Sequence, residues 1–182
     1  PRSALDRSSA ASDVYKRQVQ ALRLLSALLD GGYSARISEQ LERGEELVSG
    51  ASTSYDAYTR GDSLFTLSAT PNQQKKKTIA QAEAGLWRLL DELKAKPPTT
   101  EELERIRAQV IAGVVYQRDS ITSQATAIGS LETVGLSWKL MDTELADLQS
   151  VTPEDIQKAA RTYFTRERLS VAHVLPEETA HE

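Results

Sequence analysis

Residues 19–32 read VQALRLLSALLDGG, and their spacing decides where the fold starts. Val19, Leu22, Leu25 and Leu29 recur at helical intervals, so they share one face of a helix that must pack against the rest of the chain. Two consecutive glycines end this stretch and are a typical helix stop. We therefore expect ordered structure to begin near Val19 with a buried helix.

The segment before this helix has a different character. Residues 1–18, PRSALDRSSAASDVYKRQ, are polar and rich in serine, and they contain no apolar run of the kind found in a signal peptide. We expect residues 1–18 to be a disordered or non-native leader. On the other side of the glycines, a second short helix is predicted over 35–43, with Ser34 as its N-cap and with Ile37 and Leu41 pointing inward.

A β-hairpin is expected next. Residues 47–58 are rich in small and β-branched side chains, and residues 62–71 alternate between apolar and polar, as a half-buried strand does. The residues between them are typical of a turn. A closing strand is predicted over 168–175, because RLSVAHVL alternates again.

The remaining ordered segments have helical periodicity. Pro97 and Pro98 separate two of these helices, and Thr99 with Glu102 forms a candidate capping box for the second. Thr152 followed by Pro153 is a strong start for the last helix. The predicted helices span 72–94, 99–119 with a continuation through 121–135, 140–148, and 152–164.

These elements predict the order α-α-β-β-α-α-α-α-β. The fold class is α+β, with a small, mostly antiparallel sheet of about three strands covered on one face by helices. A sheet of about three strands is small for a domain with this many helices. We therefore expect that a strand is missing ahead of Val19. The domain is expected to span residues 19–176, followed by a flexible acidic tail over 177–182.

The composition excludes several kinds of chemistry. The chain has 182 residues, 22 Lys+Arg against 26 Asp+Glu, and no Cys. The acidic balance disfavours a nucleic-acid binder, and the missing Cys excludes disulfides, thiolate zinc sites and Cys nucleophiles. The two histidines, His173 and His181, lie in the last ten residues, so very few imidazole side chains are available for His-based catalysis. No stretch approaches the ~18–20 apolar residues of a membrane span.

Several other motifs have plainer explanations than a site. The tripeptide Arg-Gly-Asp at 60–62 matches an adhesion motif. Its Gly and Asp are, however, common residues in turns, so a turn already explains them. The lysines at 75–77 fit a solvated face better than a phosphate site, and the glutamates within 101–104 fit helix capping. The serines in 47–58 have no adjacent base, so a Ser nucleophile is not expected. That strand suits pairing with an extended peptide, or it is an ordinary edge strand.

Four phrases, in order, resemble the pitrilysin/insulinase family of zinc metallopeptidases. They are ALRLLSALLDGGYSARISEQLERGE at 21–45, DSLFTLSATP at 62–71, PTTEELERIRAQV at 98–110, and VTPEDIQKAARTYFTRERLSVAHVLP at 151–176. The resemblance implies a chamber enclosed by repeated α+β domains. It also implies that one domain carries the zinc motif His-x-x-Glu-His, with its Glu as general base, while the other half holds the peptide and binds no metal.

This chain resembles the noncatalytic, C-terminal half. Pro176 follows His173 closely and forbids a helix there, and His181 is too far along the chain to complete a zinc motif. The resemblance implies that zinc is held by a catalytic partner domain, in cis or as a partner subunit, and that a peptide is the substrate. It also favours, weakly, the bacterial periplasm. We expect no catalytic and no metal-binding residue in this chain. The alternative is a catalytically dead structural or assembly subunit of the same family.

The resemblance also nominates one substrate-binding residue. Noncatalytic halves of the family often have an Arg after the Leu of the second helix and a Tyr about seven residues later, both contacting substrate. Here Glu42 follows Leu41, Arg43 comes one position later, and the Tyr position falls near Val48. Arg43 is therefore the candidate substrate-binding residue, and its alternative role is that of a solvated arginine at a helix end.

Overall fold

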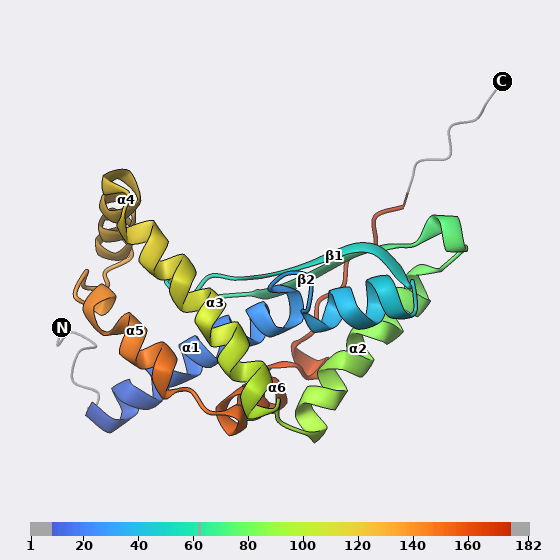
Figure 1. Ribbon diagram of the computed structural model, residues 1–182, viewed down its shortest axis with the longest axis horizontal. Helices are drawn as coiled ribbons and strands as arrows, with labels where there is room; N and C mark the ends of the chain where they lie inside the picture. The colour runs from blue at the N-terminus through green and yellow to red at the C-terminus, as the bar shows by residue number, and fades with distance from the viewer. Residues whose placement is uncertain (1–8, 62, 176–182) are drawn as a thin grey trace.

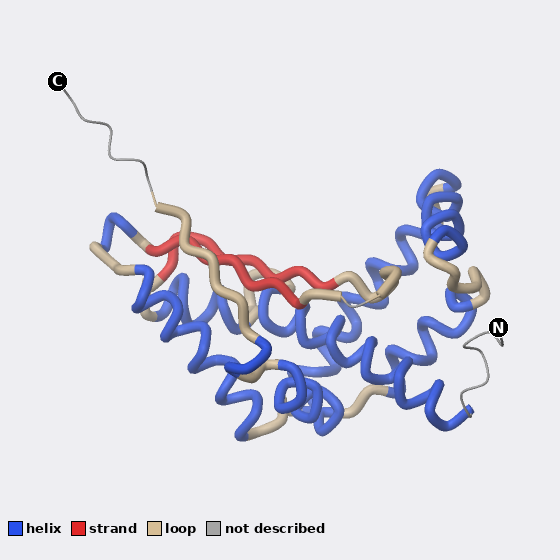
Figure 2. The backbone as a smooth tube through the Cα atoms, turned by 180° about the vertical axis from the view of Figure 1, so that it is seen from behind, coloured by secondary structure: helices blue, strands red, loops and turns tan. Residues whose placement is uncertain are grey.

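The computed structural model describes residues 9–61 and 63–175, and it has the predicted α+β class (Figure 1). The helices lie on one side of a two-stranded hairpin, which Figure 2 shows along one edge of the molecule. In chain order the elements are α1 (Ser9–Asp30), η1 (Ile37–Gly44), β1 (Val48–Tyr55), β2 (Phe65–Pro71), η2 (Gln73–Lys75), α2 (Ile79–Ala95), α3 (Thr100–Arg118), α4 (Ile121–Thr133), α5 (Leu140–Ser150), α6 (Pro153–Tyr163) and η3 (Arg166–Arg168).

Helix α1 is the centre of the core. It begins at Ser9 rather than near Val19, so part of the segment expected to be a leader is helical. Its apolar face packs against β1, α3, α5 and α6. Leu25 and Leu29 are fully buried, as the helical spacing predicted, and Leu24 and Leu28 on the adjoining face are buried as well. The remainder of the expected leader, residues 1–8, and the expected tail at 177–182 lie outside the described residues.

The second helix forms with one difference from the prediction. Ile37 and Leu41 point into the core as expected, but η1 is a π-helix that begins after Arg36 without a side-chain cap. Ser34 does not cap it, because the Ser34 hydroxyl accepts a hydrogen bond from Arg105 of α3 instead. A long-range partner therefore outcompetes the local cap.

The hairpin is antiparallel, as predicted, with shorter strands. Ala51 lies opposite Ala69, and Thr53 lies opposite Leu67. On each strand the half-buried side chains alternate with exposed ones. The half-buried side chains face the helices. The Thr53 hydroxyl, for example, is hydrogen-bonded to Ser26 on α1.

Hydrogen-bonding side chains set the helix starts. Thr152 and Asp155 form a full capping box at α6, where the Thr-Pro sequence predicted a start. Thr99 caps α3 as predicted, but the Glu102 carboxylate does not complete the box. It binds Arg36 instead. Helix α2 starts at Ile79, later than predicted, because Thr78 supplies a capping box and the residues before it form only the short turn η2.

The predicted closing strand is wrong within the described residues. Residues 166–168 form the turn η3, and residues 169–175 form neither helix nor strand. This segment runs past β2 and α2 without joining the sheet, as Figure 2 shows. An alternating sequence becomes a strand only when a neighbouring edge lies within hydrogen-bonding reach. Here the sheet of described residues has two strands, not three.

Helices α3 and α4 form an arm that rises from the body (Figure 1). Helix α4 packs mainly on α3, and Leu131 is its one buried residue. In the described parts of the chain, no helix combines the length and the hydropathy that a bilayer crossing requires.

Candidate functional site

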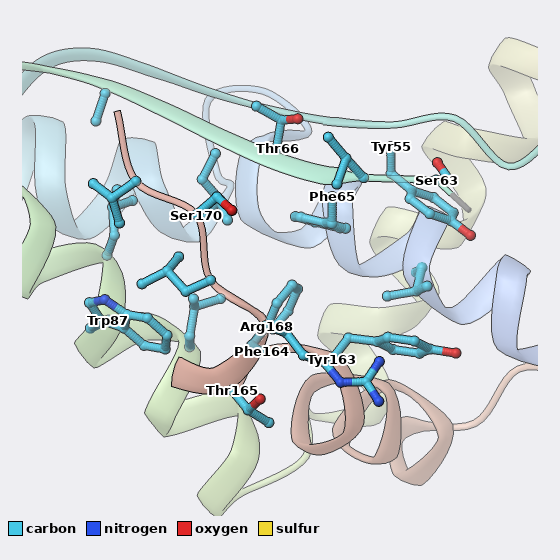
Figure 3. Close-up of a pocket in the computed structure, with 18 of the residues that line it drawn as sticks. Tyr55, Ser63, Phe65, Thr66, Trp87, Tyr163, Phe164, Thr165, Arg168 and Ser170 are labelled. Atoms are coloured by element: carbon cyan, nitrogen blue, oxygen red, sulfur yellow. The ribbon is translucent and has the colours of Figure 1, made fainter. Parts of the chain in front are cut away.

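A trough lies between β2, α2 and the C-terminal segment, and Figure 3 shows many of the side chains that line it. We call it the β2 trough and define it by the described residues that enclose it, from β2 (65–71), α2 (79–90) and the segment 163–173. Its volume is about 720 Å³. Apolar side chains that line it include those of Phe65, Leu67, Ala69, Ile79, Ala82, Leu86, Trp87, Leu90, Phe164, Leu169 and Val171, and Val19 and Leu22 of α1 border it as well.

Aromatic rings that line the trough contact one another and a nearby guanidinium. The rings of Phe65 and Phe164 meet edge to face with centroids 4.9 Å apart, and Tyr55 stacks on Phe65 at 6.0 Å. The guanidinium of Arg166, on η3, lies 3.9 Å from the centroid of the Trp87 ring on α2. Such contacts add directional stabilisation to apolar burial. The wall of the trough is therefore preformed.

The outer edge of β1 is closed by two carboxylates. The N–H of Ala51 donates to Glu42 at 3.2 Å, and the N–H of Thr53 donates to Asp30 at 3.0 Å. Edge strands present unpaired backbone groups that can template pairing with another chain, and inward-pointing charges block this. Glu42 stands where the family's Arg was expected, and this contact gives it a structural role.

The edge of β2 that borders the trough is open. In an antiparallel pair, directly opposite residues either exchange hydrogen bonds or both point away from each other. The N–H of Ala51 points away from β2, so Ala69 opposite it points its N–H and C=O away from β1. The same argument applies to Leu67, which lies opposite Thr53. No hydrogen bond to these outward groups of β2 is present among the described residues.

One imidazole–carboxylate contact lies in the lining of the trough. The Nε2 of His173 lies 3.6 Å from a carboxylate oxygen of Glu83 on α2. A catalytic zinc needs three protein ligands, and the described residues contain no group of three or more His, Asp or Glu side chains that could hold a metal. The described chain therefore does not fit a zinc ion. His181 lies outside the described residues.

Arg43 lines a second hollow, of about 560 Å³, beside the ends of the strands. Its guanidinium carbon lies 3.6 Å from the centroid of the exposed Tyr33 ring. Its Nη2 donates to the Tyr33 carbonyl at 2.6 Å, and its Nε donates to the Ser38 carbonyl at 3.2 Å. Among the described residues, no hydrogen bond uses Nη1. We call Arg43 with Tyr33 the Arg43 platform.

Sequence reasoning did not identify Tyr33 as the aromatic partner of Arg43. The expected position near Val48 is filled by a buried apolar side chain. The only available signal was the short distance along the chain from Tyr33, after the glycine pair, to Arg43 at the end of the next helix. Spacing alone cannot show that the intervening turn brings them into contact.

A separate polar network is structural. The buried Gln20 on α1 donates to the Tyr58 hydroxyl at 3.2 Å. Burial raises the pKa of Tyr58, and the nearby Arg23 opposes this effect. Arg23 also pairs with Glu144 of α5 at 2.7 Å. The network joins α1 to α5 and to the end of the hairpin, and it lines neither hollow.

Comparisons with known proteins agree with this architecture. Residues 11–110 match the family described as the Peptidase M16 inactive domain. The chain belongs to this family, which is the noncatalytic metallopeptidase domain that the resemblance predicted. A search of curated proteins finds no match.

Three solved structures share the fold. The inactive peptidase domain of a proposed zinc protease from Bordetella parapertussis has a TM-score of 0.79 and 22% identity, over 91% of this chain and 86% of that chain. A proposed zinc protease from Bordetella pertussis Tohama I has a TM-score of 0.71 and 21% identity, over 84% and 81%. A protease from Helicobacter pylori has a TM-score of 0.73 and 19% identity, over 83% of this chain but only 36% of that chain. This chain therefore spans about a third of the Helicobacter protease.

Proposed function

We propose that this chain is the peptide-binding, chamber-forming half of a zinc metalloendopeptidase whose hydrolysis is performed by another domain or subunit. The proposal is supported by membership of the inactive-domain family and by the lack of a metal-ligand cluster in the described residues. In this role the chain contributes contacts to the peptide, and the partner contributes zinc and the general base.

The observation that carries the proposal is the Arg43 platform. Two hydrogen bonds and the Tyr33 ring hold the Arg43 guanidinium in one position while leaving it exposed at a hollow. A guanidinium that is already ordered loses little conformational entropy when it binds a peptide carbonyl or carboxylate. Nη1, which takes part in no hydrogen bond among the described residues, is the donor that we assign to the peptide.

The test is a peptide-binding measurement on the purified chain. The probe is a fluorescein-labelled tryptic digest of reduced serum albumin, which supplies unstructured peptides of mixed sequence. We expect saturable binding that falls about tenfold in Arg43→Gln, the equivalent of losing one charge-assisted hydrogen bond of about 1.5 kcal/mol. Arg60→Gln is the matched control, because Arg60 is an exposed arginine in the hairpin turn.

Two outcomes would contradict the proposal. One is equal peptide binding by the Arg43 and Arg60 variants. Arg43 would then only stabilise the local structure through its hydrogen bonds to the Tyr33 and Ser38 carbonyls. The other is no peptide binding at all, combined with tight association with a zinc-bearing domain of the family, which would favour the structural or assembly subunit. Circular dichroism of both variants shows whether a loss of binding reflects unfolding.

A further inference from the structure

We propose that the hollow beside Arg43 is a subsite for a carboxylate of the bound peptide, supplied either by an acidic side chain or by the peptide's C-terminus. The inference rests on the proposed function, and it goes further by naming the class of peptide that the chain prefers. We call this hollow the Arg43 subsite. It is enclosed by the end of η1, the start of β1 and the segment 70–74, where β2 ends and η2 begins.

The first support is a pair of ordered hydrogen-bond donors in the lining. The Tyr33 and Ser38 carbonyls hold the Arg43 guanidinium through Nη2 and Nε, and Nη1 takes part in no hydrogen bond among the described residues. Asn72 is held in a similar way, because its Oδ1 accepts from the Lys75 N–H at 3.2 Å. That bond fixes the amide plane, and no hydrogen bond within the described chain uses the Asn72 Nδ2. Two donors on separate elements are therefore positioned without a partner.

The second support is that the carboxylate in the lining already has partners. The Glu42 Oε1 accepts from the Ala51 N–H at 3.2 Å, and its Oε2 accepts from the Ser38 hydroxyl at 2.7 Å. The exposed glutamines at 73–74 can rotate their amides to present N–H groups. A ligand that only accepts hydrogen bonds, as a carboxylate does, matches these donors. The charge of Glu42 offsets that of Arg43, so the attraction for an anion must come from the rim.

The third support is the charge of that rim. Two glutamates that follow η1 are paired, Glu46 with Lys75 at 3.0 Å and Glu45 with Arg88. The lysines at 76–77 come directly after η2, and neither has an ion-pair partner in the part of the chain that the structure describes. The rim therefore carries an excess of positive charge, although the whole chain has a net charge of -4. Such a local field attracts an anionic group.

These features favour a carboxylate over a peptide carbonyl. Hydrogen bonds from a guanidinium to an ionised acceptor are roughly twice as strong as those between neutral groups. The two oxygens of a carboxylate can also accept from two different donors, such as Arg43 Nη1 and Asn72 Nδ2. Carbonyl groups occur at every position of every peptide, so a contact with them would give no preference. A carboxylate contact makes the chain selective for acidic groups.

The test compares three short peptides that share one neutral alanine–serine sequence and an acetylated N-terminus. The acidic peptide has glutamate at its centre and an amidated C-terminus. The neutral peptide has glutamine there instead, and the third peptide is the neutral one with a free C-terminal carboxylate. Isothermal titration calorimetry measures each Kd without a charged label. We expect a peptide with a carboxylate to bind about tenfold more tightly than the neutral peptide. The better of the two acidic peptides shows which source of carboxylate the subsite takes.

Two variants connect the preference to the subsite. Arg43→Gln should bind all three peptides with similar Kd values. Asn72→Asp keeps an oxygen that can accept from the Lys75 N–H but replaces the Nδ2 donor with an acceptor, so it should weaken the preference while η2 stays intact. Arg60→Gln, in the hairpin turn, is the control and should retain the full preference. Asn72→Asp keeps the test decisive if Arg43→Gln fails to fold.

Three results would overturn the inference, and they separate it from the proposed function. Equal binding of the three peptides by the unmodified chain overturns the inference alone, because the chain then binds a group that every peptide has. A preference that persists in both Arg43→Gln and Asn72→Asp also overturns it, because the carboxylate is then bound elsewhere. No binding of any peptide, including the albumin digest, overturns the proposed function together with the inference.

Discussion

Arg36 and Glu102 are 66 positions apart in the sequence and are joined by two hydrogen bonds, each 2.8 Å long. The pair fastens the start of η1 to the first turn of α3, and both side chains are mostly buried. The hydrogen bonds from Arg36 lower the pKa of Glu102 below its usual range, while partial burial opposes them. The fold is therefore stabilised more by the ionised form of this carboxylate than by its protonated form.

We predict that Glu102→Gln lowers the free energy of unfolding at neutral pH by about 1.5–3 kcal/mol, since a hydrogen bond to a charged partner is lost. The folded-state pKa of Glu102 is depressed, so its contribution is complete above the unfolded-state pKa and is lost as the pH falls through the folded-state value. Urea unfolding of wild type and variant should therefore converge in acid. Glu104→Gln is the control and should change stability little, because the Glu104 side chain is 61% exposed although its partner Arg107 is mostly buried. A difference between Glu102→Gln and wild type that persists in acid contradicts the prediction.

We predict that opening the β1 edge promotes self-association. Asp30→Ala frees the N–H of Thr53, and Glu42→Ala frees the N–H of Ala51. The double variant should lose solubility and gain β-rich aggregates, because an unpaired edge can template another strand. Light scattering at increasing protein concentration measures this. Asp30→Asn keeps an acceptor for Thr53 and should aggregate less than Asp30→Ala. Equal aggregation of these two single variants would show that the carboxylate does not act by closing the edge.

We predict opposite effects of alanine at two helical glycines. A Cβ at Gly113 meets nothing within 4 Å, so Gly113→Ala should stabilise the protein by about 1 kcal/mol through helix propensity. A Cβ at Gly85 comes within 2.8 Å of Leu47 and 3.1 Å of Leu41. Both leucines are buried, so the added methyl group in Gly85→Ala should overpack the core at a cost of about 1–3 kcal/mol in stability. We expect this cost to exceed the gain in helix propensity. Thermal unfolding of the two variants tests this, and a Tm increase in both would contradict it.

We predict that the isolated chain neither binds zinc stoichiometrically nor cleaves peptides. His173 and Glu83 supply too few ligands, and their atoms approach only to 3.6 Å. After dialysis against zinc and removal of excess metal, metal analysis should find well under one zinc per chain, and His173→Ala should give the same value. One tight zinc per chain, lost in His173→Ala, would show that the tail completes a site.

The sequence predicted correctly those features that depend only on contacts between residues close together in the chain. The apolar stripe of α1, the half-buried alternation of β2 and the capping sequence at Thr152 depend on residues a few positions apart, and they appear as expected. Predictions failed where a distant group competed. Ser34 and Glu102 were expected to serve local caps, but each has a long-range arginine partner instead.

The sequence by itself determined the class of fold, the family and the small number of residues that can bind a metal. These follow from the periodicity of apolar residues, the order of the family's sequence motifs and the amino-acid composition. Only the tertiary structure decided how the edges and side chains meet. It closed the β1 edge with Asp30 and Glu42, and it placed Tyr33 under Arg43. It also kept the alternating C-terminal segment out of the sheet. A strand needs a neighbour within hydrogen-bonding reach, and the alternation of a sequence carries no information about whether that neighbour is present.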